Sequence, residues 1–167
     1  MLAVWRRRYE RLLEWIAIAL MAALAVEVTA GVAFRYSGYS LVWYDEVATI
    51  LLAWVTFYGS ALAVMKHAHI GVPEIVRMLP PGPRVAAALV AQACTLVFFG
   101  VLAWLGYSVL EILASDRLVS LPAVSVAYAQ SVIPVSAVLI VIAQVLVLPE
   151  VVHEARHGAI SKAEELI

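Results

Sequence analysis

Four long apolar segments constrain the fold of this chain more than any other feature of its sequence. A helix needs about 20 apolar residues to cross the hydrocarbon core of a bilayer, where it satisfies its own backbone hydrogen bonds. Segments that meet this requirement lie at about 12–34, 43–65, 84–113 and 123–149. The sequence therefore predicts an all-α integral membrane protein, with four transmembrane helices in a single membrane domain, 1–167. Pro134 lies inside the fourth segment and is expected to kink it.

The composition fits a chain that is embedded in lipid. Charged residues make up 14% of the 167 residues and apolar residues 65%, whereas a typical soluble domain carries about 25% charged residues. The net charge is −1, and no basic stretch is interleaved with aromatic residues. The expected surroundings are therefore a lipid bilayer, and nucleic acid is not an expected partner. The single cysteine, Cys94, allows no disulfide within the chain.

Lysine and arginine residues divide unevenly between the two ends of the predicted helices. With a cytoplasmic N-terminus, nine of them fall on the cytoplasmic side: Arg6, Arg7, Arg8, Arg11, Lys66, Arg77, Arg84, Arg156 and Lys162. Two, Arg35 and Arg117, fall on the other side. Cytoplasmic loops carry the excess of Lys and Arg. We therefore predict that both termini, including a tail over residues 150–167, are cytoplasmic.

The segment between the second and third spans carries its own periodic pattern. Its apolar residues Val72, Ile75, Val76 and Leu79 recur at helical spacing and form one stripe, with Glu74 and Arg77 off that stripe. The run "PPGP" follows and ends the pattern. We predict a short amphipathic helix over about 72–79 that lies on the cytoplasmic membrane surface.

Two histidine patterns raise the possibility of a metal site. The sequence "HEARH", His153 to His157, places two imidazoles one helical turn apart, with Glu154 as a potential general base. A catalytic zinc needs a third protein ligand, and the residues after His157 contain no further His or Cys. The second pattern, "HAH" at 67–69, could share a metal only in an extended loop. We therefore expect no metal, no cofactor and no enzymatic activity.

Ionisable residues within a span are functional candidates by default. Glu27 is the most deeply embedded charge, and it could either extend to the surface or bind a partner subunit. Glu14 lies about one turn inside the first span. If one of these carboxylates carried a proton, the chain could be a self-sufficient homodimeric proton-coupled exporter. Against that alternative, secondary transporters usually have repeated halves and broken helices around a midplane site, and the sequence shows no repeat.

The beginning of the second span combines interfacial and acidic residues. Trp43 and Tyr44 are residue types that favour the membrane–water interface. Asp45 and Glu46 follow, where carboxylates are stabilised by the free N–H groups of a helix N-terminus. Further along, Gly59 and Ala63 form a pair of small residues one turn apart, a spacing that suits close helix packing.

The stretch 34–72 resembles one family of membrane proteins, through the sequence "FRYSGYSLVWYDEVATILLAWVTFYGSALAVMKHAHIGV". It is similar to the small membrane subunit, DctQ-like, of the tripartite ATP-independent periplasmic (TRAP) transporters. The resemblance rests on motif residues that follow one another in a fixed order: Arg35, Tyr36, Trp43, Glu46, Gly59, Ser60, His69, Ile70 and Val72. Two positions depart from the family pattern: Pro73 intervenes before Glu74, and Tyr58 precedes the glycine.

The resemblance implies a role that composition alone does not. In that family the small subunit packs as fixed scaffold against a large multi-span membrane subunit, which carries the sodium and substrate sites and moves as an elevator. A periplasmic substrate-binding protein delivers an organic acid to the pair at the bacterial inner membrane. The resemblance therefore implies a scaffold subunit whose loops 35–46 and 114–123 lie near the docking site of the binding protein.

Overall fold

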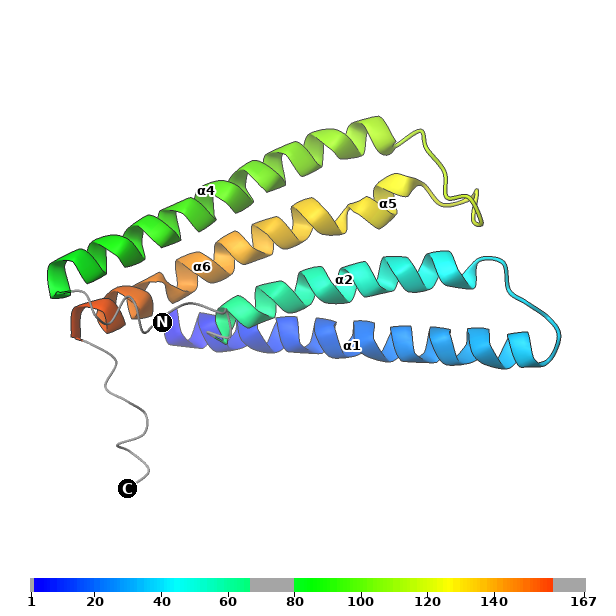
Figure 1. The fold of residues 1–167 in the computed structure, drawn as a ribbon, viewed down its shortest axis with the longest axis horizontal. Helices are drawn as coiled ribbons and strands as arrows, with labels where there is room; N and C mark the ends of the chain where they lie inside the picture. The colour runs from blue at the N-terminus through cyan, green and yellow to red at the C-terminus, as the bar shows by residue number, and fades with distance from the viewer. Residues whose placement is uncertain (1, 67–79, 158–167) are drawn as a thin grey trace, which may run out of the picture.

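The computed structural model describes residues 2–66 and 80–157. Five helices are labelled in Figure 1: α1 Leu2–Tyr36, α2 Tyr44–Met65, α4 Pro81–Leu113, α5 Val126–Gln130 and α6 Val132–His157. Four apolar segments, one each in α1, α2 and α4 and one that runs through α5 and α6, are long enough to cross a membrane. The prediction of an all-α protein with four transmembrane helices is confirmed in this respect. The predicted amphipathic helix, about 72–79, lies outside the described residues.

Helix α1 begins before the predicted first span. The first span was expected from about residue 12, but α1 begins at Leu2 and is 35 residues long, or about 52 Å at 1.5 Å per residue. Its polar first turns find partners on α6: Arg6 forms an ion pair with Glu150, and the Tyr9 hydroxyl donates to the Leu139 carbonyl at 2.7 Å. Such contacts between distant segments cannot be recognised from apolar periodicity.

The kink expected at Pro134 takes the form of a break between α5 and α6, at Ser131. A proline ring inside a helix clashes with the carbonyl four residues earlier, and for Pro134 that carbonyl belongs to Gln130, the last residue of α5. In an unbroken helix the Ala129 carbonyl would accept from the backbone N–H of residue 133. Here it accepts a hydrogen bond from the indole N–H of Trp54, at 3.0 Å.

The fourth span was predicted over about 123–149, and the helix extends further than this span. α6 continues through Pro149 to His157. A proline removes one backbone donor, but the two turns that follow still pack inward, because Ala155 is buried and Val151 contacts the core. Packing of this kind can hold a helix that propensity alone would end.

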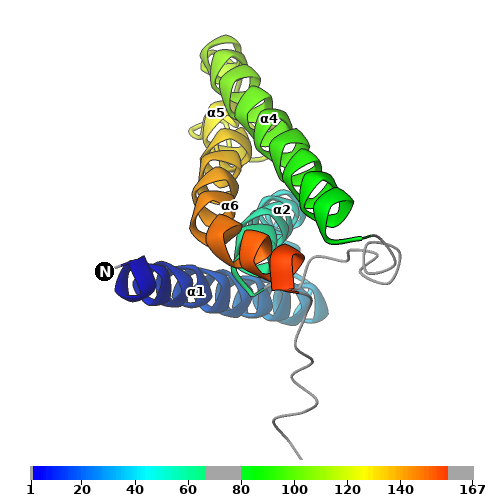
Figure 2. The ribbon, with the colours of Figure 1, turned by 90° about the vertical axis from the view of Figure 1, so that its left-hand side faces the viewer.

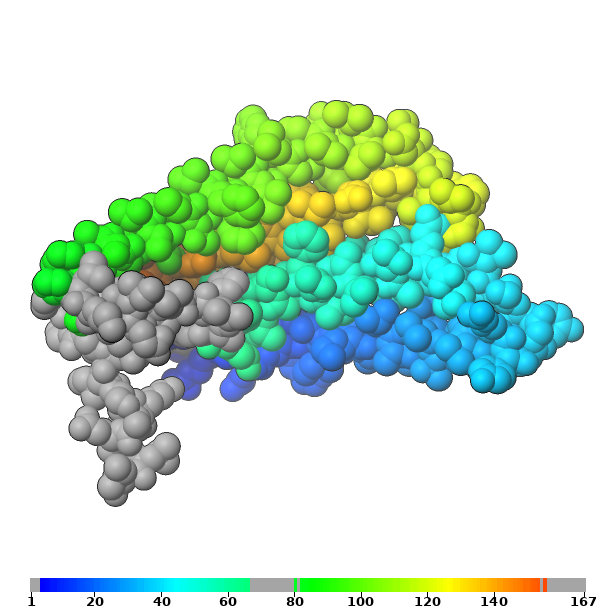
Figure 3. Space-filling model, in the orientation of Figure 1, coloured from blue at the N-terminus to red at the C-terminus, as the bar shows by residue number. Residues whose placement is uncertain are grey.

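The helices lie side by side in the order α1, α2, α6, α4, as the main contacts and the two ribbon views agree. In the space-filling view α6 is visible between α2 and α4 (Figure 3). The helices converge at the end that carries the chain N-terminus and separate toward the opposite end (Figure 1). We call these the basic end, which carries Lys66 and Arg84, and the loop end, which carries the connections 37–43 and 114–125.

The buried core is small and lies toward the basic end, where the helices converge. It consists of side chains from α1, α2 and α6: Leu13, Ala61, Val64, Met65, Ile140, Ala143 and Val147. Between α4 and α6, the Gln92 side chain donates to the Gln144 carbonyl at 3.1 Å and also to its side-chain oxygen. Both glutamines are buried. This pair satisfies polar groups that would otherwise be costly inside an apolar bundle.

The contact between α1 and α2 is close at Gly31. A Cβ atom placed on Gly31 would lie 2.4 Å from Cδ2 of Tyr44, which is far inside van der Waals contact. A side chain at residue 31 would therefore push the Tyr44 ring away from α1. Gly100, in the middle of α4, would have no atom within 4 Å of an added Cβ, so it offers a matched control.

We expect Gly31→Ala to destabilise the chain and Gly100→Ala to leave it unchanged or slightly stabilise it. Both substitutions gain up to about 1 kcal/mol of helix propensity, but the clash at Gly31 costs roughly 1–3 kcal/mol, as overpacking does in other cores. Thermal unfolding of the two purified variants in the same detergent measures the difference. Equal melting temperatures for both variants would mean that Tyr44 does not occupy this place.

Candidate functional site

Glu46 connects α2 to the loop that precedes α5. One carboxylate oxygen accepts the backbone N–H of Val119 at 3.1 Å, and the other accepts the backbone N–H of Ser120 at 2.8 Å and the Ser120 hydroxyl. Hydrogen bonds of this kind to a carboxylate are stronger than neutral ones. The sequence suggested that Glu46 caps its own helix, whereas these bonds reach residues more than seventy positions away.

The loop that Glu46 holds is itself ordered by main-chain hydrogen bonds. The Leu118 N–H donates to the Val124 carbonyl at 3.0 Å, and the Val126 N–H donates to the Asp116 carbonyl at 3.0 Å. Ser125 caps α5 by accepting the Ala127 N–H at 3.2 Å. Leu118, a residue of this loop, is buried. Glu46 therefore attaches α2 to a loop that has hydrogen bonds of its own. We call the hydrogen-bonded set of Glu46, Val119 and Ser120 the Glu46 clasp.

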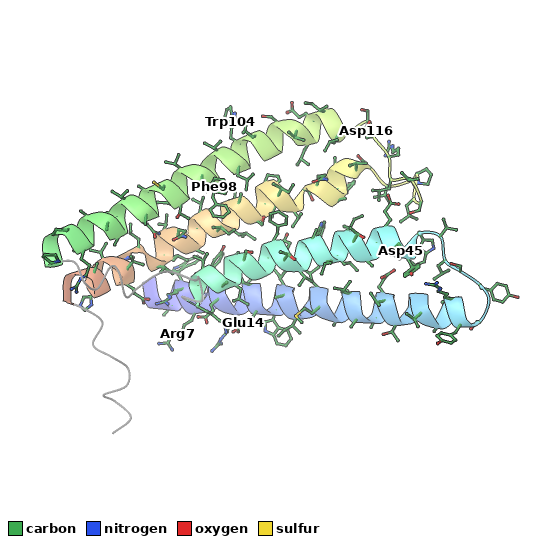
Figure 4. All side chains as sticks on the ribbon, viewed as in Figure 1. Arg7, Glu14, Asp45, Phe98, Trp104 and Asp116 are labelled. Atoms are coloured by element: carbon green, nitrogen blue, oxygen red, sulfur yellow. The ribbon has the colours of Figure 1, made fainter. Side chains whose placement is uncertain are left out.

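The other motif residues near the clasp extend outward from the loop end. Arg35 and Tyr36 are the last residues of α1, and Tyr36 is 91% exposed. Trp43 precedes the first residue of α2 and its side chain makes no capping hydrogen bond. Val119, at the loop, is 93% exposed. Figure 4 shows Asp45 and Asp116 at this same end. The loop end thus combines apolar, aromatic and charged groups that the chain leaves uncovered.

Two predicted motif residues lie in the middle of α2. A Cβ at Gly59 would meet no atom within 4 Å, and the Ser60 hydroxyl donates to the Thr56 carbonyl of its own helix at 2.8 Å. No described helix therefore packs closely against Gly59, and its expected role in helix packing stays a prediction. His69 lies outside the described residues.

Glu27 lies in α1 between the levels of Leu13 and Gly31. Both carboxylate oxygens are buried and have no hydrogen-bond partner among the residues that the structure describes. Of the two outcomes considered from the sequence, extension of the side chain to the surface does not occur in this structure. Contact with a partner subunit stays a prediction.

Some of the charged groups at the basic end form ion pairs across helices. The Lys66 ammonium lies 2.5 Å from Glu14 and 3.9 Å from Glu10, and the hydrogen bond to Glu14 raises the pKa of Lys66 above its ordinary value. Arg6 pairs with Glu150. Glu14, one of the carboxylates considered for proton coupling, therefore contributes to an ion pair that joins α1 to the end of α2.

The "HEARH" motif falls on the last turns of α6, with His153 exposed. Over residues 2–66 and 80–157, no group of three or more His, Cys, Asp or Glu side chains could hold a metal ion. His67 and His69 of the "HAH" motif are not among the described residues.

An apolar groove of about 800 Å³ runs between α4 and α6 near the loop end. From α4 it is lined by Ala103, Trp104, Tyr107 and Glu111, and from α6 by Pro134, Val135 and Val138. Trp104 is 76% exposed, and Figure 4 shows it on α4. Sequence reasoning missed this groove, and it missed Val119 and Ser120 as partners of Glu46. The only signal for the groove was Pro134, which interrupts the fourth span and separates α5 from α6.

Comparisons with known proteins give one consistent family. Residues 24–153 match the family described as tripartite ATP-independent periplasmic transporters, DctQ component. The sialic acid TRAP transporter small permease protein SiaQ of Vibrio cholerae is 28% identical over 145 residues, 86% of this chain and 83% of that protein. The C4-dicarboxylate TRAP transporter small permease protein DctQ of the same organism is 33% identical over 86 residues, 51% of this chain but only 37% of that protein.

We expect Glu46→Ala to release the loop without unfolding the helices. Backbone amide exchange at Val119 and Ser120 should become several-fold faster, because both N–H groups lose their acceptor, and hydrogen–deuterium exchange read by mass spectrometry measures it. Asp45→Ala is the matched control, since it also removes one exposed carboxylate at the start of α2. Equal acceleration of exchange in the two variants would show that the loss of a carboxylate charge releases the loop, and that the hydrogen bonds of the clasp are not what orders it.

Proposed function

The chain belongs to the DctQ family of tripartite ATP-independent periplasmic transporters, and we propose that it is the scaffold subunit that supports a large, sodium-coupled elevator subunit. The substrate would be an organic acid that a periplasmic binding protein delivers. The relatives' names state a C4-dicarboxylate and sialic acid, and both are carboxylic acids. The observation that carries the scaffold role is the distribution of polar groups, which lie mostly at the two ends of the bundle.

The polar groups inside the membrane-spanning part of the chain favour a scaffold role over a transport path. Hydroxyl groups along the spans donate to carbonyls of their own helices, as Thr49, Thr56 and Thr95 do. In the buried polar pair Gln92 and Gln144, the Gln92 amide donates to Gln144. A substrate path needs unsatisfied polar groups that converge near the midplane. Glu27 is the exception at depth, and its carboxylate oxygens have no hydrogen-bond partner among the described residues.

The surroundings of the subunit follow from the same proposal. It would lie in the bacterial inner membrane, with the basic end cytoplasmic and the loop end in the periplasm. The uncovered groups of the loop end, Tyr36, Trp43 and Val119, would then lie where a periplasmic binding protein approaches. Labelling of a cysteine at Ser37 by an impermeant thiol reagent on intact spheroplasts, with a cysteine at Arg8 protected, checks this orientation.

The groove between α4 and α6 is the contact surface that we propose for the large subunit. Its aromatic and apolar walls lie within the membrane-spanning part of the chain. A helix of a partner would bury Trp104, Val135 and Val138 there and gain van der Waals contact, which drives helix association in lipid. The polar group at its rim, Glu111, lies toward the loop end.

We expect Ala103→Trp, which fills the groove, to reduce co-purification with the large subunit at least several-fold. Ala91→Trp is the matched control, because Ala91 is an exposed alanine on α4 that does not line the groove. Affinity capture of the large subunit from detergent extracts measures both variants, with expression of each chain determined in parallel. Full capture by Ala103→Trp would place the contact on another face.

The proposed function itself is tested by reconstitution. A thermal-shift screen first identifies the organic acid that stabilises the binding protein. In liposomes under a sodium gradient, this chain alone should take up none of that acid. Uptake should appear when the large membrane subunit and the binding protein are added, and fall sharply when this chain is left out. Uptake by this chain alone would overturn the proposal in favour of the self-sufficient proton-coupled exporter.

A further inference from the structure

Three arginines on the outward side of α1 have no partner among the described residues of the basic end. Arg6 and Lys66 are engaged in ion pairs with Glu150 and Glu14. Arg7, Arg8 and Arg11 are exposed, and none of them forms an ion pair or hydrogen bond within residues 2–66 and 80–157. Figure 4 shows Arg7 directed away from the other helices. We call Arg7, Arg8 and Arg11 the arginine face.

Helix length places the arginine face at the level of lipid headgroups. The apolar part of α1 ends at Phe34, and the about 20 residues that cross the hydrocarbon core reach back from there to Trp15. Trp15 is 71% exposed, and tryptophan favours the boundary between acyl chains and headgroups. Arg11 follows one turn beyond Trp15, and Arg7 and Arg8 follow one turn beyond Arg11. The three guanidinium groups therefore lie just outside the hydrocarbon core.

The arrangement of the arginine face is unfavourable unless an anion lies between its members. Arg7 and Arg11 are four residues apart and Arg8 and Arg11 are three apart, so their charges are neighbours on one helix surface and repel each other. The acidic residues nearest in the sequence do not relieve this repulsion, because Glu10 and Glu14 are directed to Lys66. Guanidinium groups match the geometry of phosphate oxygens, so a phosphate would relieve it best.

We propose that the arginine face and the apolar surface beside it bind an anionic phospholipid, with the headgroup phosphate between the arginines and an acyl chain along α1. The apolar part favours a lipid over an acidic protein surface. Leu12, Trp15 and Ile18 continue from the arginines toward the membrane interior, and all three are more than half exposed. A ligand that covers both parts must carry negative charge at one end and a hydrocarbon chain at the other.

The test uses the purified full chain in detergent, mixed with equal amounts of dioleoyl phosphatidylglycerol and dioleoyl phosphatidylcholine. The two lipids have the same acyl chains, so a difference in retained adducts reports on the headgroup. We expect native mass spectrometry to show a preference for phosphatidylglycerol. The preference should fall by roughly fivefold for each arginine replaced by glutamine, the factor that about 1 kcal/mol per cation near an anionic surface provides. The combined variant is R7Q/R8Q/R11Q.

The matched control is R35Q/R117Q, which removes the exposed arginines of the loop end and should leave the preference unchanged. Circular dichroism identifies any variant that fails to fold, and R8Q and R11Q alone then replace the combined variant. Equal retention of the two lipids by the natural chain would overturn the proposal, as would equal losses in the arginine-face and control variants. It would also be overturned if R7Q/R8Q/R11Q kept the lipid preference but lost the large membrane subunit, since the face would then contact protein.

Discussion

The structure depends on one constraint, which is that a polar group inside a bilayer must find its partner within the protein. Each helix meets this constraint for its own backbone, and several side chains follow the same rule, with Glu27 as an exception among the described residues. Thr56 and Ser60 donate along their own helix, while Gln92 pairs with Gln144. At the break before α6, the Trp54 indole supplies the hydrogen bond that the Ala129 carbonyl would otherwise receive from its own helix.

The arrangement of the helices follows from how little the chain needs to bury. In lipid, apolar side chains gain little by leaving the surface, so helices can lie in a row instead of closing into a bundle around one core. Here α1, α2, α6 and α4 succeed one another in that way, and the core around Leu13 and Ile140 lies toward one end. Ion pairs such as Lys66 with Glu14 join the helices where they leave the membrane. At the other end the Glu46 clasp joins α2 to the loop before α5.

The number of transmembrane helices could be inferred from the sequence because length and apolarity are local properties, and the family could be inferred because its motif residues follow one another in a fixed order. The beginning of α1 at Leu2 could not be inferred from the sequence. The first turns of that helix are supported by contacts of Arg6 and Tyr9 with α6, which lies far along the chain. Glu46 was recognised as a candidate from its position, but its partners Val119 and Ser120 were not, since a backbone N–H carries no sequence signal. Spacing alone predicted close packing at Gly59, whereas among the described residues Gly31 packs against Tyr44 and Gly106 packs against Pro134.

The Glu46 clasp has a consequence for how such a chain can vary over evolutionary time. Two of its three hydrogen bonds end on main-chain amides, which every residue except proline provides. Residue 119 can therefore change, and residue 120 can change with the loss of only the hydroxyl bond, as long as the loop keeps its path. A residue at position 46, in contrast, must offer two acceptor oxygens at the same reach. Residues on the surface of the loop end can thus be substituted to suit different neighbours, while a single glutamate holds the loop in place against the membrane-spanning helices.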